Sequence, residues 1–261
     1  MLATRIIPTL LHRGTTLVKG KQFNSWRSVG NVQQAARVHA MRGVDELCIL
    51  DIGATPEGRG PDFSLVEKLT EGNFTPITIG GGVRTVEDVK LLLRAGADKV
   101  VIGTAVCERI EFVRDLAEIV GAQAIAVAID YRITIDGRPC LMGDGGTVPG
   151  VAQTTDGLLQ PIHPVMWAKD LEILGAGEII LTSIDREGMM EGYDLEMIAA
   201  VSKSVSIPVI AHGGCGTYQH MLEAIQAGAS AVAAGSMFQF TDQTPKGAAQ
   251  YLAAKGIEVR L

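Results

Sequence analysis

An α/β barrel of the TIM (β/α)8 type is the fold class that the sequence predicts, on three observations. Short runs rich in β-branched residues alternate with helical patterns, which favours a parallel sheet covered by helices. Eight such pairs fit into the 261 residues, and that length suits one barrel of this type. A segment of the first half, GGVRTVEDVKLLLRAGADKVVIGT, also recurs in the second half as GGCGTYQHMLEAIQAGASAVAAGS. We therefore expect a single domain over residues 1–261.

The expected strands follow the β-branched runs, and the expected helices occupy the segments between them. Strands are expected at 5–11, 47–52, 75–79, 99–103, 124–130, 178–183, 208–212 and 231–235. Helices are expected at 32–42, 63–69, 86–95, 110–120, 164–174, 195–204, 219–227 and 246–254. The third helix illustrates the pattern, because Val89, Leu92 and Leu93 share one face and Glu87 and Lys90 point outward.

The two related segments match position by position without a shift of register. Equivalent residues are always 132 positions apart (213 − 81 = 132). The pairs are Gly81 and Gly213, Gly82 and Gly214, Gly103 and Gly235, and Thr104 and Ser236. The match extends upstream to the pairs Pro76 and Pro208, Asp62 and Asp194, and Glu46 and Glu178. We therefore expect a barrel built from two duplicated half-barrels, at about 1–122 and 123–261.

Composition excludes several classes of protein. The chain is 47% apolar and 20% charged, and no apolar run approaches the length of about 18 residues that a membrane span needs. The start, MLATRIIPTLLHRG, lacks the features of a signal peptide, so we expect a cytoplasmic protein. A net charge of −6 without a Lys and Arg cluster argues against nucleic acid as a partner. The four cysteines show no metal-ligand spacing, and we expect no metal and no cofactor.

The repeated glycines predict two phosphate sites at the C-terminal rim of the barrel. Each copy places a Gly-Gly pair after one strand and a glycine followed by a hydroxyl residue after the next, which exposes backbone N–H groups. One site would use Gly81, Gly82, Gly103 and Thr104, and the other Gly213, Gly214, Gly235 and Ser236. A single copy would be explained more simply by tight turns, but the duplication favours a substrate with a phosphate at each end. Asp51 and Thr182 end their strands at the same rim.

Charged residues mark the opposite end of the barrel. Arg5, Glu46, Lys99 and Glu178 stand at or just before the starts of four expected strands. Any one of them alone would most simply be a solvated strand end. Two cations and two anions that converge, however, would form a paired ring that closes the barrel bottom.

Several motifs together resemble the cyclase subunit of imidazole glycerol phosphate synthase over essentially the full length. They are RIIP, LVKG, DELCILDI, IGGGVRTVEDVKLLLRAGADKV, AIDYR, GAGEIILTSIDREG, GYDLEMI and IPVIAHGGCG. The resemblance implies a barrel that binds a bis-phosphorylated ribulosyl aminoimidazole carboxamide, with a glutaminase subunit docked at the barrel bottom. It also implies that ammonia enters through a gate of four charged residues, which by match are Arg5, Glu46, Lys99 and Glu178.

The catalytic residues that the resemblance implies are only partly present. The family uses two aspartates for acid–base chemistry, and Asp130 matches the second of them. Leu11 stands at the position of the first, and leucine cannot transfer a proton. His12 is adjacent, but neighbouring residues of a strand point to opposite faces. Lys19, on the first loop, is the other residue expected to act in catalysis.

Other departures from the family pattern surround the same site. Gly103 replaces an asparagine, Glu187 an aspartate, His212 a serine and Thr9 a cysteine. The region 131–164 is longer than usual and rich in glycine, and we expect it to form a flap over the rim. His163 lies in this region and is given no role, because a lone loop histidine is more often a surface residue.

Two functions remain open at this stage. The chain is expected either to be a cyclase subunit of the histidine-pathway type, or to resemble paralogues from surface-polysaccharide gene clusters. Those paralogues pair with a glutaminase and deliver ammonia to a sugar amidotransferase, and RIIPTLL followed by LVKGKQF favours that branch. The complete charged ring argues against a merely structural protein. The DELCILDI and DREG matches argue against a related isomerase with the same half-barrel ancestry.

Overall fold

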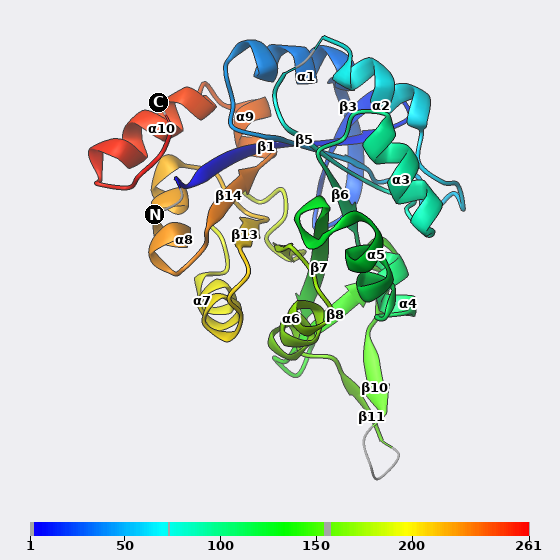
Figure 1. The fold of residues 1–261 in the computed structure, drawn as a ribbon. Coiled ribbons are helices and arrows are strands. Elements are labelled where there is room, and N and C mark those ends of the chain that lie inside the picture. The colour runs from blue at the N-terminus through cyan, green and yellow to red at the C-terminus, as the bar shows by residue number, and fades with distance from the viewer. Residues whose placement is uncertain (1–2, 73, 154–157, 261) are drawn as a thin grey trace.

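Eight parallel strands close into a barrel in the computed structural model, which describes residues 3–72, 74–153 and 158–260. The barrel strands are β1 (Arg5–Arg13), β4 (Leu47–Asp51), β5 (Ile77–Gly80), β6 (Lys99–Ile102), β7 (Ile125–Ile133), β12 (Glu178–Ser183), β13 (Val209–His212) and β14 (Ala231–Ala234). They pair in this order, and β14 returns to pair with β1 (Figure 1). The predicted TIM (β/α)8 barrel is therefore confirmed, with every expected strand in place.

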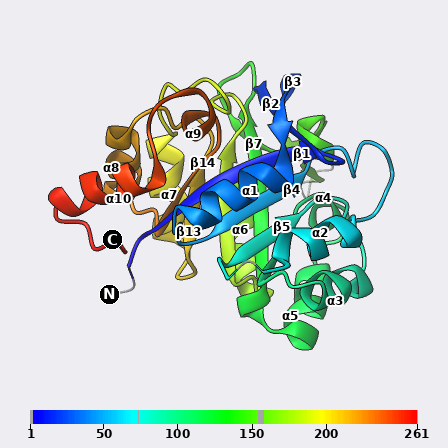
Figure 2. The ribbon, with the colours of Figure 1, turned by 90° about the horizontal axis from the view of Figure 1, so that it is seen from above.

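Helices follow the barrel strands and cover the barrel from outside (Figures 1 and 2). The long helices are α1 (Val32–Met41), α2 (Phe63–Thr70), α3 (Val86–Arg94), α5 (Phe112–Val120), α6 (Pro164–Ile173), α7 (Leu195–Ser204), α8 (Tyr218–Gln226) and α10 (Pro245–Ala254). Two short helices were not expected, namely α4 (Thr104–Glu108) and α9 (Ser236–Phe240). No helix of the described ranges is long and apolar enough to cross a membrane.

Side-chain alternation divides the buried residues into two sets. Ile6 faces the layer between strands and helices, whereas its neighbour Ile7 faces the inside of the barrel. The inner set is small, and it consists of Ile7, Cys48, Val101, Ala126, Ile180, Ile210, Ala231 and Ala233. Because these side chains are mostly small, they do not fill the barrel interior completely, and a narrow cavity remains among them.

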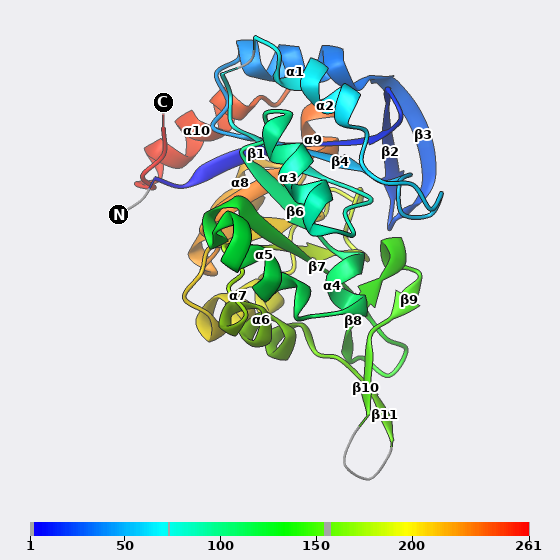
Figure 3. The ribbon, with the colours of Figure 1, turned by 45° about the vertical axis from the view of Figure 1, so that its right-hand side comes forward.

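The first loop folds into a hairpin that the sequence reading did not predict. Strands β2 (Thr16–Lys21) and β3 (Asn24–Asn31) pair antiparallel, and β2 continues the sheet from the end of β1. The turn between them places Gln22 and Phe23 in the left-handed region, at φ 52° and 59°. The hairpin stands beside the C-terminal rim (Figures 2 and 3).

The long region after β7 forms further strands, and only part of it lies at the rim. Strand β7 pairs antiparallel with β8 (Pro139–Gly143), which pairs with β9 (Val148–Pro149). Strands β10 (Val151–Gln153) and β11 (Leu159–Pro161) form a separate ribbon that projects away from the barrel (Figures 1 and 3). Residues 154–157 of the expected flap lie outside the described residues. The expectation of a flap over the rim is thus wrong for the β10–β11 ribbon.

Candidate functional site

A cavity of about 280 Å³ opens at the C-terminal rim of the barrel. Seven predicted site residues line it, namely Asp51, Gly81, Gly82, Gly103, Thr104, Asp130 and Thr182. The hairpin contributes Phe23 and Trp26, and the region after β8 contributes Asp144, Gly145 and Thr147. These five residues were not predicted, because they lie outside the barrel strands and no sequence motif relates them to the strand ends that they approach.

The glycines of the first half reach this cavity in conformations that a side chain would disturb. Gly81 and Gly82 have φ angles of 112° and 71°, in the left-handed region that favours glycine. A Cβ on Gly81 would overlap the backbone of Asp51, and one on Gly82 would overlap that of Arg59. The backbone therefore approaches the cavity wall closely here, as a site for an anion on N–H groups would require.

The second half carries the matching arrangement around a separate, smaller cavity of about 10 Å³. Its lining includes Gly213, Gly214, Gly235 and Ser236, together with Glu187. Gly213 and Gly214 have φ angles of 88° and 103°, again in the left-handed region. Among the described residues, the buried hydroxyl of Ser236 has no hydrogen-bond partner. An unpaired buried hydroxyl beside N–H groups is a feature that a bound oxyanion would satisfy.

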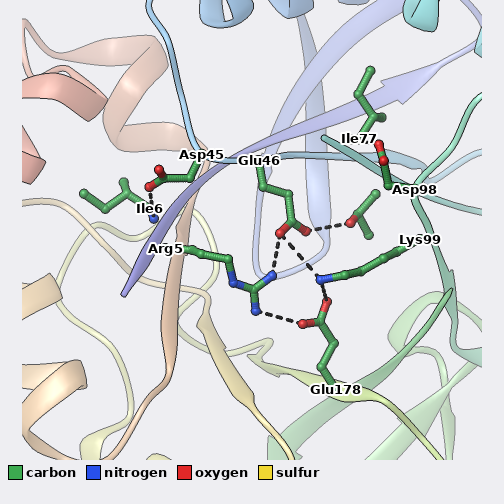
Figure 4. Close-up of polar contacts among 9 residues, drawn as sticks. Arg5, Ile6, Asp45, Glu46, Ile77, Asp98, Lys99 and Glu178 are labelled. Carbon is green, nitrogen blue, oxygen red and sulfur yellow. Dashed lines mark hydrogen bonds and ion pairs between the residues drawn. The ribbon is translucent and has the colours of Figure 1, made fainter. Parts of the chain in front are cut away.

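The four charged residues at the barrel bottom meet in one paired cluster (Figure 4). The guanidinium of Arg5 donates to Glu46 at 2.5 Å and to Glu178 at 2.8 Å, and the Nζ of Lys99 lies 2.8 Å from Glu178. Lys99 also lies 3.7 Å from Glu46. The two carboxylates are only 4% exposed as residues, so each buried anion is compensated by two cations.

Thr78, which the sequence reading missed, completes this cluster. Its hydroxyl donates to the second oxygen of Glu46 at 2.6 Å. Thr78 lies on β5 directly above the bottom of the barrel, and its side chain is buried. The hydroxyl holds the Glu46 carboxylate in the orientation that meets Arg5.

A narrow cavity of about 10 Å³ lies inside the barrel, between the charged cluster and the rim. Its walls are mostly apolar, and they comprise Ile7, Thr9, Glu46, Cys48, Leu50, Ile180, Ile210, His212 and Ala233. Leu50, Ile180 and His212 also line the large rim cavity. These three side chains therefore separate the barrel interior from the rim cavity, and His212 is the polar one among them.

Asp130 lies on β7 at the base of the rim cavity and has an altered acidity. Burial raises the pKa of its carboxyl group to about 6, the hydroxyl of Thr182 acts in the opposite direction as a hydrogen-bonding partner, and Glu187 raises it further. A carboxyl group with this pKa exchanges protons readily near neutral pH. Asp130 thus has the property that the sequence reading required of an acid–base residue.

Leu11 lines the same cavity as Asp130, but its side chain has no group that can transfer a proton. Its side chain is 3% exposed and lines the cavity wall on β1. His12 points the other way, as strand alternation predicts, and its Nδ1 lies 2.7 Å from the carbonyl oxygen of Gly14. Because His12 lines a different small cavity against α2, it cannot replace the missing carboxylate.

Comparison with known proteins agrees with this geometry. A family model described as Histidine biosynthesis protein matches residues 5–244. The chain is 42% identical over 259 residues to a protein of Thermobifida fusca (strain YX) named imidazole glycerol phosphate synthase subunit HisF, and the match covers 99% of each chain. The chain belongs to the histidine biosynthesis protein family. The resemblance stated from the sequence motifs is therefore confirmed.

Lys19 of this family member is not on the surface of a loop. It lies on β2, is 1% exposed, and its Nζ donates to the carbonyl oxygen of Thr9 at 3.1 Å. Burial lowers the pKa of Lys19 to about 8, and Glu187 acts in the opposite direction. Lys19 does not line the rim cavity, but a Cβ on Gly235, which lines the smaller second cavity, would overlap its Nζ.

Asp51 of this family member is held by a residue that the sequence reading missed. The guanidinium of Arg59 donates to both oxygens of Asp51, at 2.9 and 3.2 Å, and the N–H of Gly53 donates to one of them at 3.0 Å. Asp51 therefore anchors the loop after β4 and also lines the rim cavity. His163 caps α6 by accepting from the N–H of Val165 at 3.2 Å. Among the described residues, no cluster of His, Cys, Asp and Glu could hold a metal ion.

Proposed function

We propose that this protein is a cyclase subunit of the imidazole glycerol phosphate synthase type. In this proposal it receives ammonia from a glutaminase subunit at the barrel bottom and adds it to a bis-phosphorylated substrate at the rim. The observation that carries the proposal is that three features of the barrel interior share residues and so follow one another. They are the paired cluster around Glu46, the narrow interior cavity and the Asp130 cavity.

The passage of ammonia is supported by the chemistry of the interior. Uncharged ammonia tolerates apolar walls, whereas ammonium would lose its hydration there. The cluster of Arg5, Glu46, Lys99 and Glu178 closes the entrance with ion pairs that can exchange partners. Above it, the interior cavity has the volume of about one small molecule, which suits ammonia and excludes larger substrates.

The substrate site is supported by its two glycine-lined ends. One phosphate would bind at Gly82 and Thr104, and the other at Gly214 and Ser236, which are matching positions of the repeat. Asp130 would then lie between the phosphates and act as the proton donor and acceptor. The half-barrel boundaries at about 1–122 and 123–261 stay a prediction from the repeat.

The test is cyclisation of the histidine-pathway substrate by the complex of this chain with its glutaminase. Turnover is expected with glutamine and also with ammonium alone, because ammonium bypasses the glutaminase. The separate yield of glutamate measures the glutaminase itself. The proposal would be contradicted if glutamine yielded glutamate but neither glutamine nor ammonium yielded any cyclised product.

Leu11 favours a second candidate, in which the protein delivers ammonia without cyclising a substrate. The acceptor would then be a sugar amidotransferase that receives the ammonia at the rim. The exchange Leu11→Asp distinguishes the two, since it supplies the carboxylate that the family pattern requires at the end of β1. If the cavity still fits the substrate, this variant is expected to gain about tenfold or more in cyclisation with ammonium. No gain, together with an inactive wild type, would favour ammonia delivery.

A further inference from the structure

The residue that replaces the family's serine, His212, is part of a row of three polar side chains inside the barrel mouth. Thr182 on β12 lies in register with Asp130 on β7 and with His212 on β13. Residues in register on neighbouring parallel strands point to the same face, so all three side chains face the barrel interior. Asp130, Thr182 and His212 all line the rim cavity.

Hydrogen bonding connects this row. The Nδ1 of His212 lies 3.2 Å from the hydroxyl oxygen of Thr182, in a buried environment. Thr182 is also paired in register with Asp130, and its hydroxyl lowers the pKa of that carboxyl as a hydrogen-bonding group. An ionised carboxylate can only accept, and a hydroxyl has one proton to donate. The unprotonated oxygen of a neutral Asp130 likewise only accepts, so Thr182 donates to that oxygen and accepts from Nδ1–H of His212 while the other oxygen of Asp130 carries the proton.

This arrangement determines where the imidazole can act as a base. With its one proton on Nδ1, a neutral His212 has an unprotonated Nε2. The His212 side chain lines both the interior cavity and the rim cavity, so it stands where a molecule leaving the interior first meets a bound substrate. Leu11, where the family pattern has its first catalytic aspartate, offers no proton acceptor in the same cavity.

We propose that His212 is the second acid–base residue of this site and takes the role that Leu11 cannot fill. The inference rests on the proposed function and names a further catalytic residue for it. In the addition step, the nitrogen of ammonia forms a bond to a carbonyl carbon of the substrate, and the π electron pair moves to the carbonyl oxygen. That oxygen takes the proton of Asp130, and the nitrogen gives one proton to Nε2 of His212. The products are a neutral carbinolamine, the carboxylate of Asp130 and the imidazolium of His212, and these two charged groups lie on either side of Thr182.

The charged groups near His212 fit this role. Burial lowers the pKa of His212, and Lys19 on β2 lowers it too, while Glu187 in the loop after β12 raises it. Asp130 on β7 and His212 on β13 lie on either side of Thr182 on β12. His212 is therefore neutral at pH 7 and ready to accept a proton.

The test measures cyclisation of the histidine-pathway substrate by the full complex with saturating ammonium. The exchange His212→Gln keeps a side chain that can hydrogen-bond to Thr182 but cannot accept a proton, and a loss of about 10²- to 10⁴-fold in kcat is expected. His163→Asn is the matched control, since it replaces a histidine outside the cavity with another residue that caps helices, and its kcat should stay within about twofold of wild type.

Two further measurements separate catalysis from structure. In wild type, kcat/KM should fall at low pH as His212 is protonated, and His212→Gln should lose this acid limb. Leu11→Asp placed in the His212→Gln protein should recover at least about tenfold of the lost activity, because it restores a carboxylate to the same cavity. A His212→Gln protein that keeps wild-type kcat and the acid limb would overturn the inference alone. A wild-type complex without any cyclisation would overturn the proposed function and, with it, this role of His212.

Discussion

The two ends of the barrel differ in how completely they keep the family pattern. At the bottom, Arg5, Glu46, Lys99 and Glu178 are all present and all paired. At the rim, Leu11 and His212 both depart from the pattern, although Asp130 remains between them in the same cavity. Under the proposed function, the entry of ammonia and its use would therefore be separable properties, because only the rim departs from the residues that the family resemblance implies.

Packing explains why the two ends tolerate change differently. Each carboxylate of the bottom cluster is buried and paired with two cations, so removing one partner leaves an uncompensated charge. The rim residues line a cavity of about 280 Å³, where a side chain can change without creating a buried unpaired ion. Variants at the rim and at the bottom should therefore differ in the size of the activity loss and in whether the loss depends on the nitrogen source.

The largest effect is expected from Asp130→Asn at the rim. The amide cannot transfer the proton, so cyclisation should fall by about 10²- to 10⁴-fold, equally with glutamine and with ammonium. Steady-state assays with both nitrogen sources measure this. A loss seen with glutamine alone would mean that Asp130 acts in ammonia transfer, and the contrast between the two ends would disappear.

The same variant should be more stable than wild type, and the difference should depend on pH. The folded-state pKa of Asp130, about 6, lies above its ordinary value of 3.8. The buried carboxyl therefore favours folding most at a pH below 3.8, and this contribution is lost as the pH rises through 6. At pH 7.5 the loss amounts to about 3 kcal/mol, which the neutral amide avoids. Urea unfolding at pH 4 and pH 7.5 should show a gain only at the higher pH, and equal gains would contradict the burial argument.

At the bottom, Lys99→Ala should separate the two nitrogen sources. Glu178 then loses its partner at 2.8 Å, and the cluster no longer closes in the same way. Glutamine-dependent cyclisation should fall by roughly tenfold, which corresponds to about 1.4 kcal/mol, while ammonium-dependent cyclisation changes little. Lys68→Ala, on the exposed face of α2, is the control. Equal losses with both nitrogen sources would remove the argument for a gate.

The smallest effect is expected from Ser236→Ala in the second glycine-lined site. One hydrogen bond to an oxyanion contributes about 0.5–1.5 kcal/mol, so phosphate or substrate affinity should fall by roughly threefold to tenfold. Ser202→Ala is a matched control, because its hydroxyl is likewise buried without a partner among the described residues. Calorimetric titration measures both. An unchanged affinity in Ser236→Ala would argue against a phosphate at this end.

The sequence predicted the barrel well because its signals are local or repeated. The eight strands follow β-branched runs, and the constant separation of Gly81 from Gly213 locates matching strand ends without any knowledge of contacts. The charged cluster was predictable for the same reason, since Arg5 and Lys99 begin strands and Glu178 begins another. Strand starts of a parallel barrel must all meet at one end.

Contacts between side chains that meet across the rim could not be predicted from the sequence. The β2–β3 hairpin depends on a turn in which Gln22 and Phe23 adopt the left-handed conformation. Neither residue type favours that conformation, so the sequence did not indicate the turn. Arg59 lies in a loop, and only the folded chain brings its guanidinium to Asp51.

By itself, the sequence determined the fold, the charged residues at the closed end of the barrel and the presence of a leucine at position 11. Those follow from residue type and strand position, which the chain specifies locally. Only the tertiary structure decided that Thr182 joins His212 to Asp130, and that Lys19 is buried against Thr9. The physical reason is register. Strands from distant parts of the chain align to within one residue, and a shift by one would turn each side chain to the opposite face.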